Sequence, residues 1–321
     1  MEDKNLTFIL APLQGFTDVT YRTLFARHFS GMDEAVAPFI STMSQQRLKY
    51  SRIKDVDPDL NQELFVVPQI LGNSAEDFIF LADHLAAMGH QRINWNLGCP
   101  HSKIAKKNRG SGLLLFPGEI DLLLTTILSR ISGSLSVKIR LGRKSRDEIH
   151  DLIAMFNNHD LEGIILHPRT GVQMYQGGAD LEAFGQAMEG SRHEFTYNGD
   201  ITDRASFARV RDRYPQVTRF MIGRGILANP FLAEDIRGTA PEGTNRLDRL
   251  MAFHEDLFRG YEKIFSGPGH LIGRMKGFWS FLGPSFPGSR KPLKKIMKTS
   301  SVPDYLDRVE EFFKSCPEFP F

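Results

Sequence analysis

The sequence predicts an α/β fold in which a (β/α)8 TIM barrel is followed by a small C-terminal helical domain. Two observations favour the barrel. Eight short apolar runs alternate with helical patterns, and no Gly-rich dinucleotide fingerprint follows the first run. Eight parallel units close more naturally into a barrel than into an open sheet. A third observation favours the second domain, because no run after Arg224 resembles a strand.

The eight expected strands are rich in β-branched residues. In chain order they are Phe8–Leu13, Glu34–Phe39, Leu64–Leu71, Arg92–Leu97, Leu135–Leu141, Gly163–His167, Glu194–Asn198 and Arg219–Ile222. Between the third and fourth, Ser74 is expected to cap a crossover helix, with Asp77 three residues later. The apolar side chains that would share one face of this helix are Phe78, Leu81, Ala82 and Leu85.

The helical domain is expected to follow a linker at residues 238–243, Gly-Thr-Ala-Pro-Glu-Gly. Beyond it, helical spacing recurs around residues 247–257, 275–281 and 305–312. We therefore expect a barrel of residues 1–238 and three or four helices within residues 239–321.

The composition is that of a soluble globular protein. The 321 residues are 41% hydrophobic and 24% charged, with no run of about 18 apolar residues that could cross a membrane. Acids among residues 1–5 do not fit a secretory signal. The two cysteines, Cys99 and Cys316, are too few for a disulfide framework and lack metal-ligand spacing. We expect a cytoplasmic protein without a metal site.

Polar side chains are expected to point into one mouth of the barrel. In the fifth strand the apolar alternates Val137, Ile139 and Leu141 suit the helix layer. The polar side chains that would then face inward, in this and four other strands, are Ser136, Lys138, Arg140, Asn94, Asn96, Gln69, His167 and Asn198. Any one of them has a structural explanation, such as an ion pair for Lys138 or a bridge between strands for Gln69. Their shared position late in the strands favours a ligand site.

The turns after the last two strands favour a phosphorylated ligand. They read Asn-Gly-Asp at residues 198–200 and Gly-Arg-Gly at residues 223–225. Glycines let backbone N–H groups approach phosphate oxygens, and an arginine adds a bidentate cation. This pair of loops commonly forms a phosphate site in such barrels.

Cys99 follows the fourth strand on a loop that continues into a basic stretch, residues 103–109. A free cysteine is usually a buried hydrophobic residue, and we interpret Cys316 in this way. A thiol with a pKa of roughly 8.5 is mostly protonated at neutral pH, so Cys99 can act as a proton donor.

Seven short motifs, in order along nearly the whole chain, resemble those of the bacterial tRNA-dihydrouridine synthase (Dus) family. They are Ala11–Asp18, Gln69–Gly72, Asn96–Pro100, Lys138–Gly142, His167–Thr170, Asn198–Ile201 and Gly223–Gly225. The resemblance implies FMN-dependent reduction of uridine to 5,6-dihydrouridine in the tRNA D-loop, with NADPH or NADH as electron donor. It implies tRNA as a partner, and neither a membrane nor an obligate protein partner.

The resemblance also implies roles for individual residues. The cofactor-binding set is Pro12, Leu13 and Gln14 through their backbone, Gln69 and Lys138 at the flavin ring, and His167, Asn198, Gly199, Asp200, Gly223 and Arg224 at the phosphate. Asn96 would contact a uracil flipped out of the tRNA stack, with Arg140 also in the substrate-binding set. Flavin N5 would deliver hydride to carbon 6 of uracil, and Cys99 would donate the proton to carbon 5.

The helical domain is expected to bind the tRNA backbone. Residues 290–298 carry five cations and no acid, and Arg274 and Lys276 lie beside Phe278 and Trp279. The residues assigned to tRNA binding are Arg274, Lys276, Lys294 and Lys295. Without the resemblance, a solvated helix face is the better explanation of these cations.

Four places depart from the family pattern. Leu13 and Gln14 stand in place of the usual Met and Ala, and Pro168 follows the histidine where Gly is common. The second strand ends in Ala-Pro-Phe at residues 37–39, where relatives often carry a Glu before the apolar residue, so substrate contacts from this strand stay open. Two other functions are considered: an FMN barrel acting on a free pyrimidine, and a tRNA-binding homologue without redox chemistry.

Overall fold

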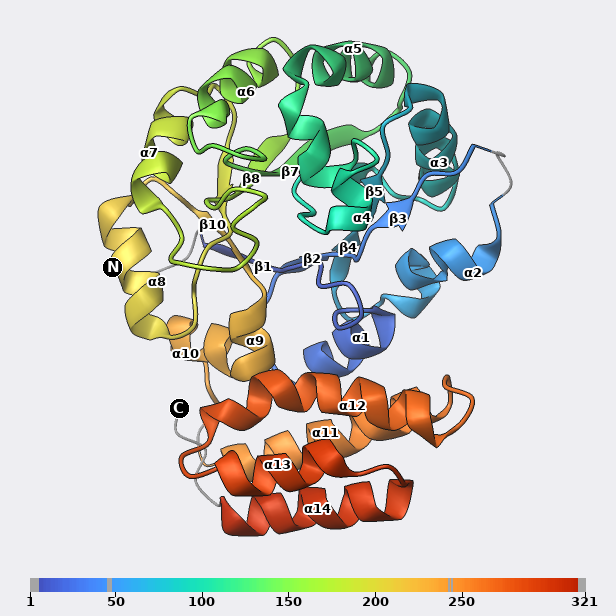
Figure 1. Ribbon diagram of the computed structural model, residues 1–321, viewed down its shortest axis with the longest axis vertical. Helices are drawn as coiled ribbons and strands as arrows, with labels where there is room; N and C mark the ends of the chain where they lie inside the picture. Colours follow the sequence, from blue (N-terminus) through green and yellow to red (C-terminus); the bar gives the residue numbers. More distant parts are fainter. Residues whose placement is uncertain (1–5, 45–47, 242, 244, 317–321) are drawn as a thin grey trace.

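The structure is a computed structural model that describes residues 6–44, 48–241, 243 and 245–316. In Figure 1 a ring of strands and helices occupies the upper part, and the C-terminal helices form layers beneath it. The predicted start of the chain, residues 1–5, and part of the predicted linker, Glu242, lie outside the described residues.

Every strand pairing in the sheet is parallel, in the order β3-β5-β6-β7-β8-β9-β10-β1-β2-β4. The strands are β1 Thr7–Leu10, β2 Glu34–Val36, β3 Ile40–Ser41, β4 Phe65–Val67, β5 Gln69–Leu71, β6 Arg92–Asn96, β7 Ser134–Arg140, β8 Gly163–His167, β9 Phe195–Tyr197 and β10 Arg219–Ile222. Because β4 continues into β5 across a single residue, the two ends of this order meet and the sheet closes. The predicted barrel is confirmed.

Two of the eight predicted strands are each interrupted by a proline. The second forms only β2, which ends before Pro38, and β3 follows directly after the predicted run; the third is split into β4 and β5 at Pro68. Proline has no backbone N–H, so it cannot donate to a strand ladder. Its carbonyl still accepts, since the Asn94 N–H donates to Pro68 O at 2.9 Å. The pairing therefore continues past the break, and the count of ten strands describes an eight-unit barrel.

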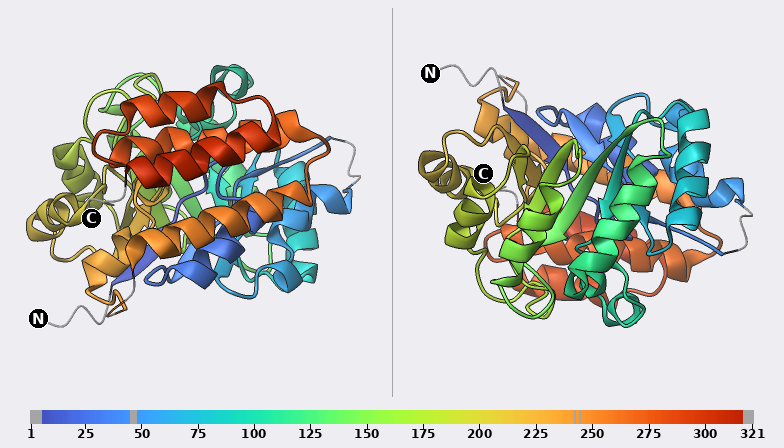
Figure 2. Two further views of the ribbon diagram at one scale, coloured as in Figure 1. Left: turned by 90° about the horizontal axis from the view of Figure 1, so that it is seen from below. Right: turned by 90° about the horizontal axis from the view of Figure 1, so that it is seen from above.

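The helices of the barrel surround the strands, as the right-hand view in Figure 2 shows. They are α1 Val19–His28, α2 Tyr50–Ile53, α3 Ala75–Ala87, α4 Ser102–Ala105, α5 Pro117–Leu128, α6 Glu148–Phe156, α7 Leu181–Glu189, α8 Arg204–Arg213, α9 Arg224–Ala228 and α10 Leu232–Arg237. Short 3-10 helices cover Lys54–Val56, Pro58–Leu60 and Gly110–Leu115. Ser74 caps α3 as predicted, because its side chain accepts from the Asp77 N–H.

The C-terminal region is helical, as predicted. It comprises α11 Arg246–Glu262, α12 Pro268–Leu282, a 3-10 turn at Gly283–Ser285, α13 Arg290–Lys298 and α14 Val302–Ser315. Helices α11 and α12 contact α1 and α9 of the barrel. In the left-hand view of Figure 2 the C-terminal helices lie in front of the barrel. The exact domain boundary at residues 238 and 239 stays a prediction.

The alternation within the strands separates two apolar cores. Val137, Ile139 and Leu141 belong to the large core between strands and helices, as predicted. A smaller core fills the inside of the barrel, and its members are Ile9, Ala11, Val36, Val67, Ile165 and Met221. Above this plug, toward the carboxyl ends of the strands where ligands bind in such barrels, the inward positions are polar. In the described part of the chain, no helix has the length and apolarity needed to span a membrane.

Candidate active site

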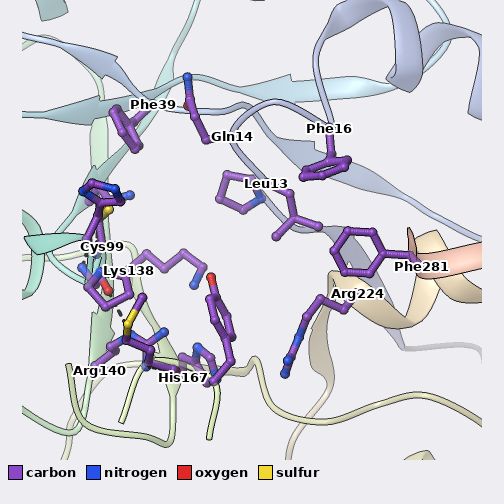
Figure 3. Close-up of a pocket in the computed structure, with 17 residues that line it drawn as sticks. Leu13, Gln14, Phe16, Phe39, Cys99, Lys138, Arg140, His167, Arg224 and Phe281 are labelled. Atoms are coloured by element: carbon purple, nitrogen blue, oxygen red, sulfur yellow. Dashed lines mark hydrogen bonds between the residues drawn. The ribbon is translucent and has the colours of Figure 1, made fainter. Parts of the chain in front are cut away.

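A cavity of about 510 Å³ opens at the carboxyl ends of the strands. Its walls come from Pro12, Leu13, Gln14, Phe16, Phe39, Asn96, Gly98, Cys99, Pro100, His101, Lys138, Arg140, His167, Met174, Tyr175, Arg224 and Phe281. Figure 3 shows Cys99 on one side and Arg224 on the other, with the Lys138 side chain extending between them. Three lining residues are lysine or arginine, and none of the described residues lining the cavity is Asp or Glu. The cavity is therefore suited to an anionic ligand.

A ladder of amide side chains crosses the barrel beneath the cavity. Asn94 Nδ2 donates to Ser136 Oγ at 2.8 Å, and Gln69 Nε2 donates to Asn94 Oδ1 at 2.7 Å. Asn96 Nδ2 in turn donates to Gln69 Oε1 at 2.7 Å. Gln69 is fully buried and bridges β5 and β6, and it does not line the cavity. The ladder fixes the orientation of Asn96, which does line it.

Asn96 holds the loop that carries Cys99. Its Oδ1 accepts from the backbone N–H of Gly98 at 3.2 Å and of Cys99 at 2.9 Å. The Cys99 carbonyl accepts from both the N–H and the hydroxyl of Ser111, each at 3.0 Å. Gly110 packs against this carbonyl at a φ of +55°, and a Cβ there would lie 2.8 Å from it. The thiol is thus fixed at the end of β6.

The Cys99 thiol is half-buried in the cavity wall. Burial raises the pKa of Cys99 above its ordinary value, although a backbone hydrogen bond from His101 and the charges of Arg140 and Lys138 oppose the shift. The thiol therefore carries its proton at neutral pH. The same two cations would stabilise the thiolate after the proton has left.

Lys138 points into the cavity from β7, as Figure 3 shows. Among the described residues its ammonium group has no hydrogen-bond or ion-pair partner, so the alternative of an ion pair in the barrel is not supported. Burial, together with the nearby Arg140, lowers the pKa of Lys138 from 10.5 to about 7. A half-buried cation without a counter-charge is costly, so an electronegative ligand edge beside Lys138 would restore its charge.

Arg140 ties two loops of the cavity together. Its Nε donates to Gly98 O at 2.9 Å, and its Nη1 donates to Thr170 O at 3.0 Å and Met174 O at 2.6 Å. The guanidinium carbon also lies 5.4 Å from the Tyr175 ring centroid. Arg140 lines the cavity, and its backbone contacts fix the cysteine loop relative to the loop after β8.

The predicted phosphate residues are only partly assembled around the cavity. His167 and Arg224 line it, whereas Asn198, Gly199, Asp200 and Gly223 do not. The amide of Asn198 donates to Met221 O at 2.8 Å and bridges β9 and β10. Asp200 accepts from Arg224 at 3.0 Å and from Arg169. Burial and four surrounding cations hold the pKa of His167 well below its usual value, so this imidazole is neutral.

Several lining residues were not among the predicted site residues. Tyr175 lies between two cations, 4.7 Å from the Arg224 guanidinium and 5.4 Å from that of Arg140. The others are Phe16, Phe39, Gly98, Pro100, His101, Met174 and Phe281. Tyr175 lies in a Gly-rich segment directly after a site motif. A single aromatic residue in such a segment could have been predicted from the sequence to line the site. Phe281 reaches the cavity from α12, after the last barrel strand in the chain, and no local pattern marks it.

The four residues assigned to tRNA binding have different surroundings. Arg274 donates to Gly15 O and pairs with Asp18 at 3.4 Å, so it is tied to the first barrel loop. Lys276 donates to Thr299 O. Lys295 pairs with Glu311 of α14, while Lys294 is exposed and has no ion-pair partner among the described residues. The positive charge of α13 is thus partly neutralised by a carboxylate from another helix, α14.

In the described ranges, no group of three or more His, Cys, Asp or Glu residues is placed to hold a metal ion. The chemical groups that the cavity does offer are one protonated thiol, a neutral imidazole and cations on opposite walls. This arrangement can bind an anionic ligand and deliver one proton from a fixed position.

A comparison with family models matches residues 9–259 to a model described as dihydrouridine synthase (Dus). A probable tRNA-dihydrouridine synthase of Staphylococcus aureus (strain COL) is 30% identical over 322 residues, which cover 95% of this chain and 92% of that protein.

Among solved structures, histamine dehydrogenase from Rhizobium sp. 4-9 superposes with a TM-score of 0.56 at 11% identity over 86% of this chain. The chain spans about half of that enzyme, 49% of its length. The old yellow enzyme homologue from Zymomonas mobilis superposes with a TM-score of 0.52 at 12% identity, over 75% of this chain and 91% of that one. At such identities the two structures support the barrel fold alone.

Proposed function

This chain belongs to the dihydrouridine synthase family, and from that premise we propose that it reduces uridine in the D-loop of tRNA to 5,6-dihydrouridine, using FMN and NADPH or NADH. The observation that carries the proposal is the placement of a protonated thiol, Cys99, on the wall of a cavity that also holds Lys138 and Arg224 and no described carboxylate.

The residues present fit FMN. Lys138 provides an unpartnered cation for the electronegative edge of an isoalloxazine ring, and Arg224 with neutral His167 provides donors for a phosphate. Residues 12–14 form another wall. When bound, FMN supplies the hydride. The other predicted cofactor residues do not line the cavity and would hold the groups that touch the ligand; they are Gln69, Asn198, Gly199, Asp200 and Gly223.

Cys99 would supply the proton that completes the reduction. Its raised pKa keeps hydrogen on Sγ until a developing carbanion at carbon 5 of uracil accepts it. The thiolate that remains lies within the field of Lys138 and Arg140, which lowers the cost of the transfer. Asn96 would both fix this loop and contact the uracil, with Arg140 holding the opposite loop in register.

The substrate would reach this cavity as a flipped base, since the groups that would act on it line a cavity rather than an open surface. Phe16, Phe39 and Phe281 line that mouth and offer ring faces for stacking. The exposed cations of α13, Lys294 among them, would contact the tRNA backbone. Arg274 and Lys276 would support this surface from within.

The experiment that tests the function is anaerobic. Purified protein with FMN is reduced by NADPH, and reoxidation is then followed by absorbance after addition of unmodified tRNA. We expect reoxidation by tRNA, with dihydrouridine appearing in the nucleoside digest. Reoxidation by free uracil or turnover of dihydroorotate without tRNA would favour the free-pyrimidine alternative. Protein that binds tRNA but no flavin would favour the redox-inactive alternative.

A further inference from the structure

Arg169 is a buried cation that the chemistry described so far does not use. It follows β8 and is 2% exposed, yet it does not line the cavity. Its Nη1 lies 3.0 Å from His167 Nε2 and 3.1 Å from Asp200 Oδ1. Its Nη2 donates to Gly177 O at 2.6 Å, and its Nε donates to the same oxygen at 3.3 Å. Arg169 therefore connects the histidine, the carboxylate and the loop after β8.

The contact with Arg169 determines which nitrogen of His167 carries the proton. A guanidinium group has five N–H donors and no acceptor, so His167 Nε2 must accept. In a neutral imidazole the proton then resides on Nδ1. No hydrogen bond to Nδ1 occurs among the described residues, and His167 lines the cavity. The ring therefore offers one N–H donor to a ligand.

Asp200 is occupied by the arginines and is not available to repel an anion. Its Oδ1 accepts from Arg169 Nη1 at 3.1 Å and from Arg224 Nη2 at 3.0 Å. Its Oδ2 accepts from the Ala179 N–H at 3.1 Å and from Arg169 Nη2. One carboxylate thus fixes two guanidinium groups, one behind the wall and one on it. A carboxylate facing a phosphate directly would repel it. The two arginines that pair with Asp200 offset this repulsion.

We propose that Arg169 is a positioning residue for a phosphate monoester: it holds His167 as an Nδ1–H donor and, through Asp200, aims the Arg224 guanidinium at the same group. The proposal rests on the proposed function, in which that monoester is the phosphate of FMN. Arg169 does not line the cavity, and we expect its loss to weaken binding at the phosphate end of the ligand and not at the ring.

The test compares FMN with riboflavin, which has the same ring and no phosphate. Binding of each to the apo protein is measured by quenching of flavin fluorescence in wild type and in Arg169→Met. We expect the variant to lose roughly tenfold or more in FMN affinity, the range for one charge-assisted contact, and to keep its riboflavin affinity. Arg249→Met is the matched control, because Arg249 also bridges a carboxylate, Glu234, and a carbonyl, His28 O, away from the cavity.

A second pair of variants tests which ring nitrogen of His167 carries the proton. The amide nitrogen of Asn lies near the position of Nδ1, whereas that of Gln lies near Nε2. We therefore expect His167→Asn to keep more FMN affinity than His167→Gln, with riboflavin affinity equal in both. This comparison stays informative if Arg169→Met fails to fold.

The outcomes separate the inference from the proposed function. Wild type that binds neither flavin would overturn both. Wild type that binds both flavins equally, or an Arg169→Met variant that keeps the wild-type preference for FMN, would overturn only the role of Arg169. Equal losses of FMN and riboflavin affinity in that variant would show that Arg169 supports the fold as a whole, and would also overturn the inference.

Discussion

Replacing Cys99 by alanine is the most direct test of the proton-donor role. The substitution removes the only thiol among the described residues that line the cavity. It leaves the loop in place, because that loop is held through backbone groups: the Cys99 N–H donates to Asn96 at 2.9 Å and the Cys99 carbonyl accepts from Ser111 at 3.0 Å. Flavin binding and reduction by NADPH should therefore be unchanged. The loss should be confined to the step that consumes the proton.

The expected magnitude follows from general acid catalysis. A positioned proton donor contributes about 10² to 10⁴ in rate, so reoxidation of the reduced enzyme by tRNA should slow by that factor in Cys99→Ala. In wild type the rate should depend on pH in one direction. Because burial raises the pKa of the thiol from 9.0, the donor stays protonated across neutral pH and the rate should fall only in the alkaline range above it.

The assay is stopped-flow absorbance of reduced enzyme mixed with unmodified tRNA, repeated from pH 6 to pH 10. Cys316→Ala is the control, since Cys316 is buried in the helical region away from the cavity and its removal should alter stability and not the reoxidation rate. An unchanged rate in Cys99→Ala, or a rate in wild type that rises through the alkaline range, would refute the assignment of Cys99 as the donor.

Three further predictions concern the cofactor, the RNA and the fold. Because the pKa of Lys138 is about 7 in the apo protein, FMN binding at pH 8 should be accompanied by uptake of a proton at this amino group. Calorimetry in buffers of different ionisation enthalpy measures the uptake, and proton uptake that persists in Lys138→Met would show that Lys138 is not its source. Lys294→Glu with Lys295→Glu should weaken tRNA binding and reduce the slope of log affinity against log salt by about one to two units; an unchanged slope would return α13 to the role of a solvated face. Gly110→Ala should destabilise the fold by about 1–3 kcal/mol, because a side chain is disfavoured at a φ of +55° and its Cβ would lie 2.8 Å from the cysteine carbonyl; denaturant titration checks this, and wild-type stability would contradict it.

The sequence predicted the barrel well because its signals are local. Strand alternation placed Val137, Ile139 and Leu141 against the helices and turned Lys138 inward, as the structure has them. The family resemblance drawn from seven motifs is confirmed. The interruption at Pro68 was readable in principle, since proline cannot donate to a ladder.

The rest of the site depends on contacts that no local pattern encodes. Arg169 was visible inside the motif at residues 167–170, but its position behind His167 follows from the path of the chain after β8 and from Asp200, 31 residues away. Lys295 looked like part of an unopposed cluster because its partner, Glu311, comes from the next helix. Sequence patterns therefore located the mouth of the barrel, and tertiary packing decided which polar groups touch the cavity and which stand behind it.

The contacts of Arg274 bear on what the helical region does. This residue was assigned to tRNA, yet it donates to Gly15 O and pairs with Asp18, while Tyr261 donates to Asp18 at 2.7 Å. Phe16, on the same barrel loop, packs edge-on between the rings of α12, with centroid distances of 5.5 Å and 5.2 Å. The loop that would carry backbone contacts to the flavin is therefore fixed by the helical region. Since that region also contributes an aromatic side chain to the cavity wall, it is part of the site itself. Any tRNA-binding surface on the helical region would therefore be connected to the proposed cofactor cavity through this packed loop.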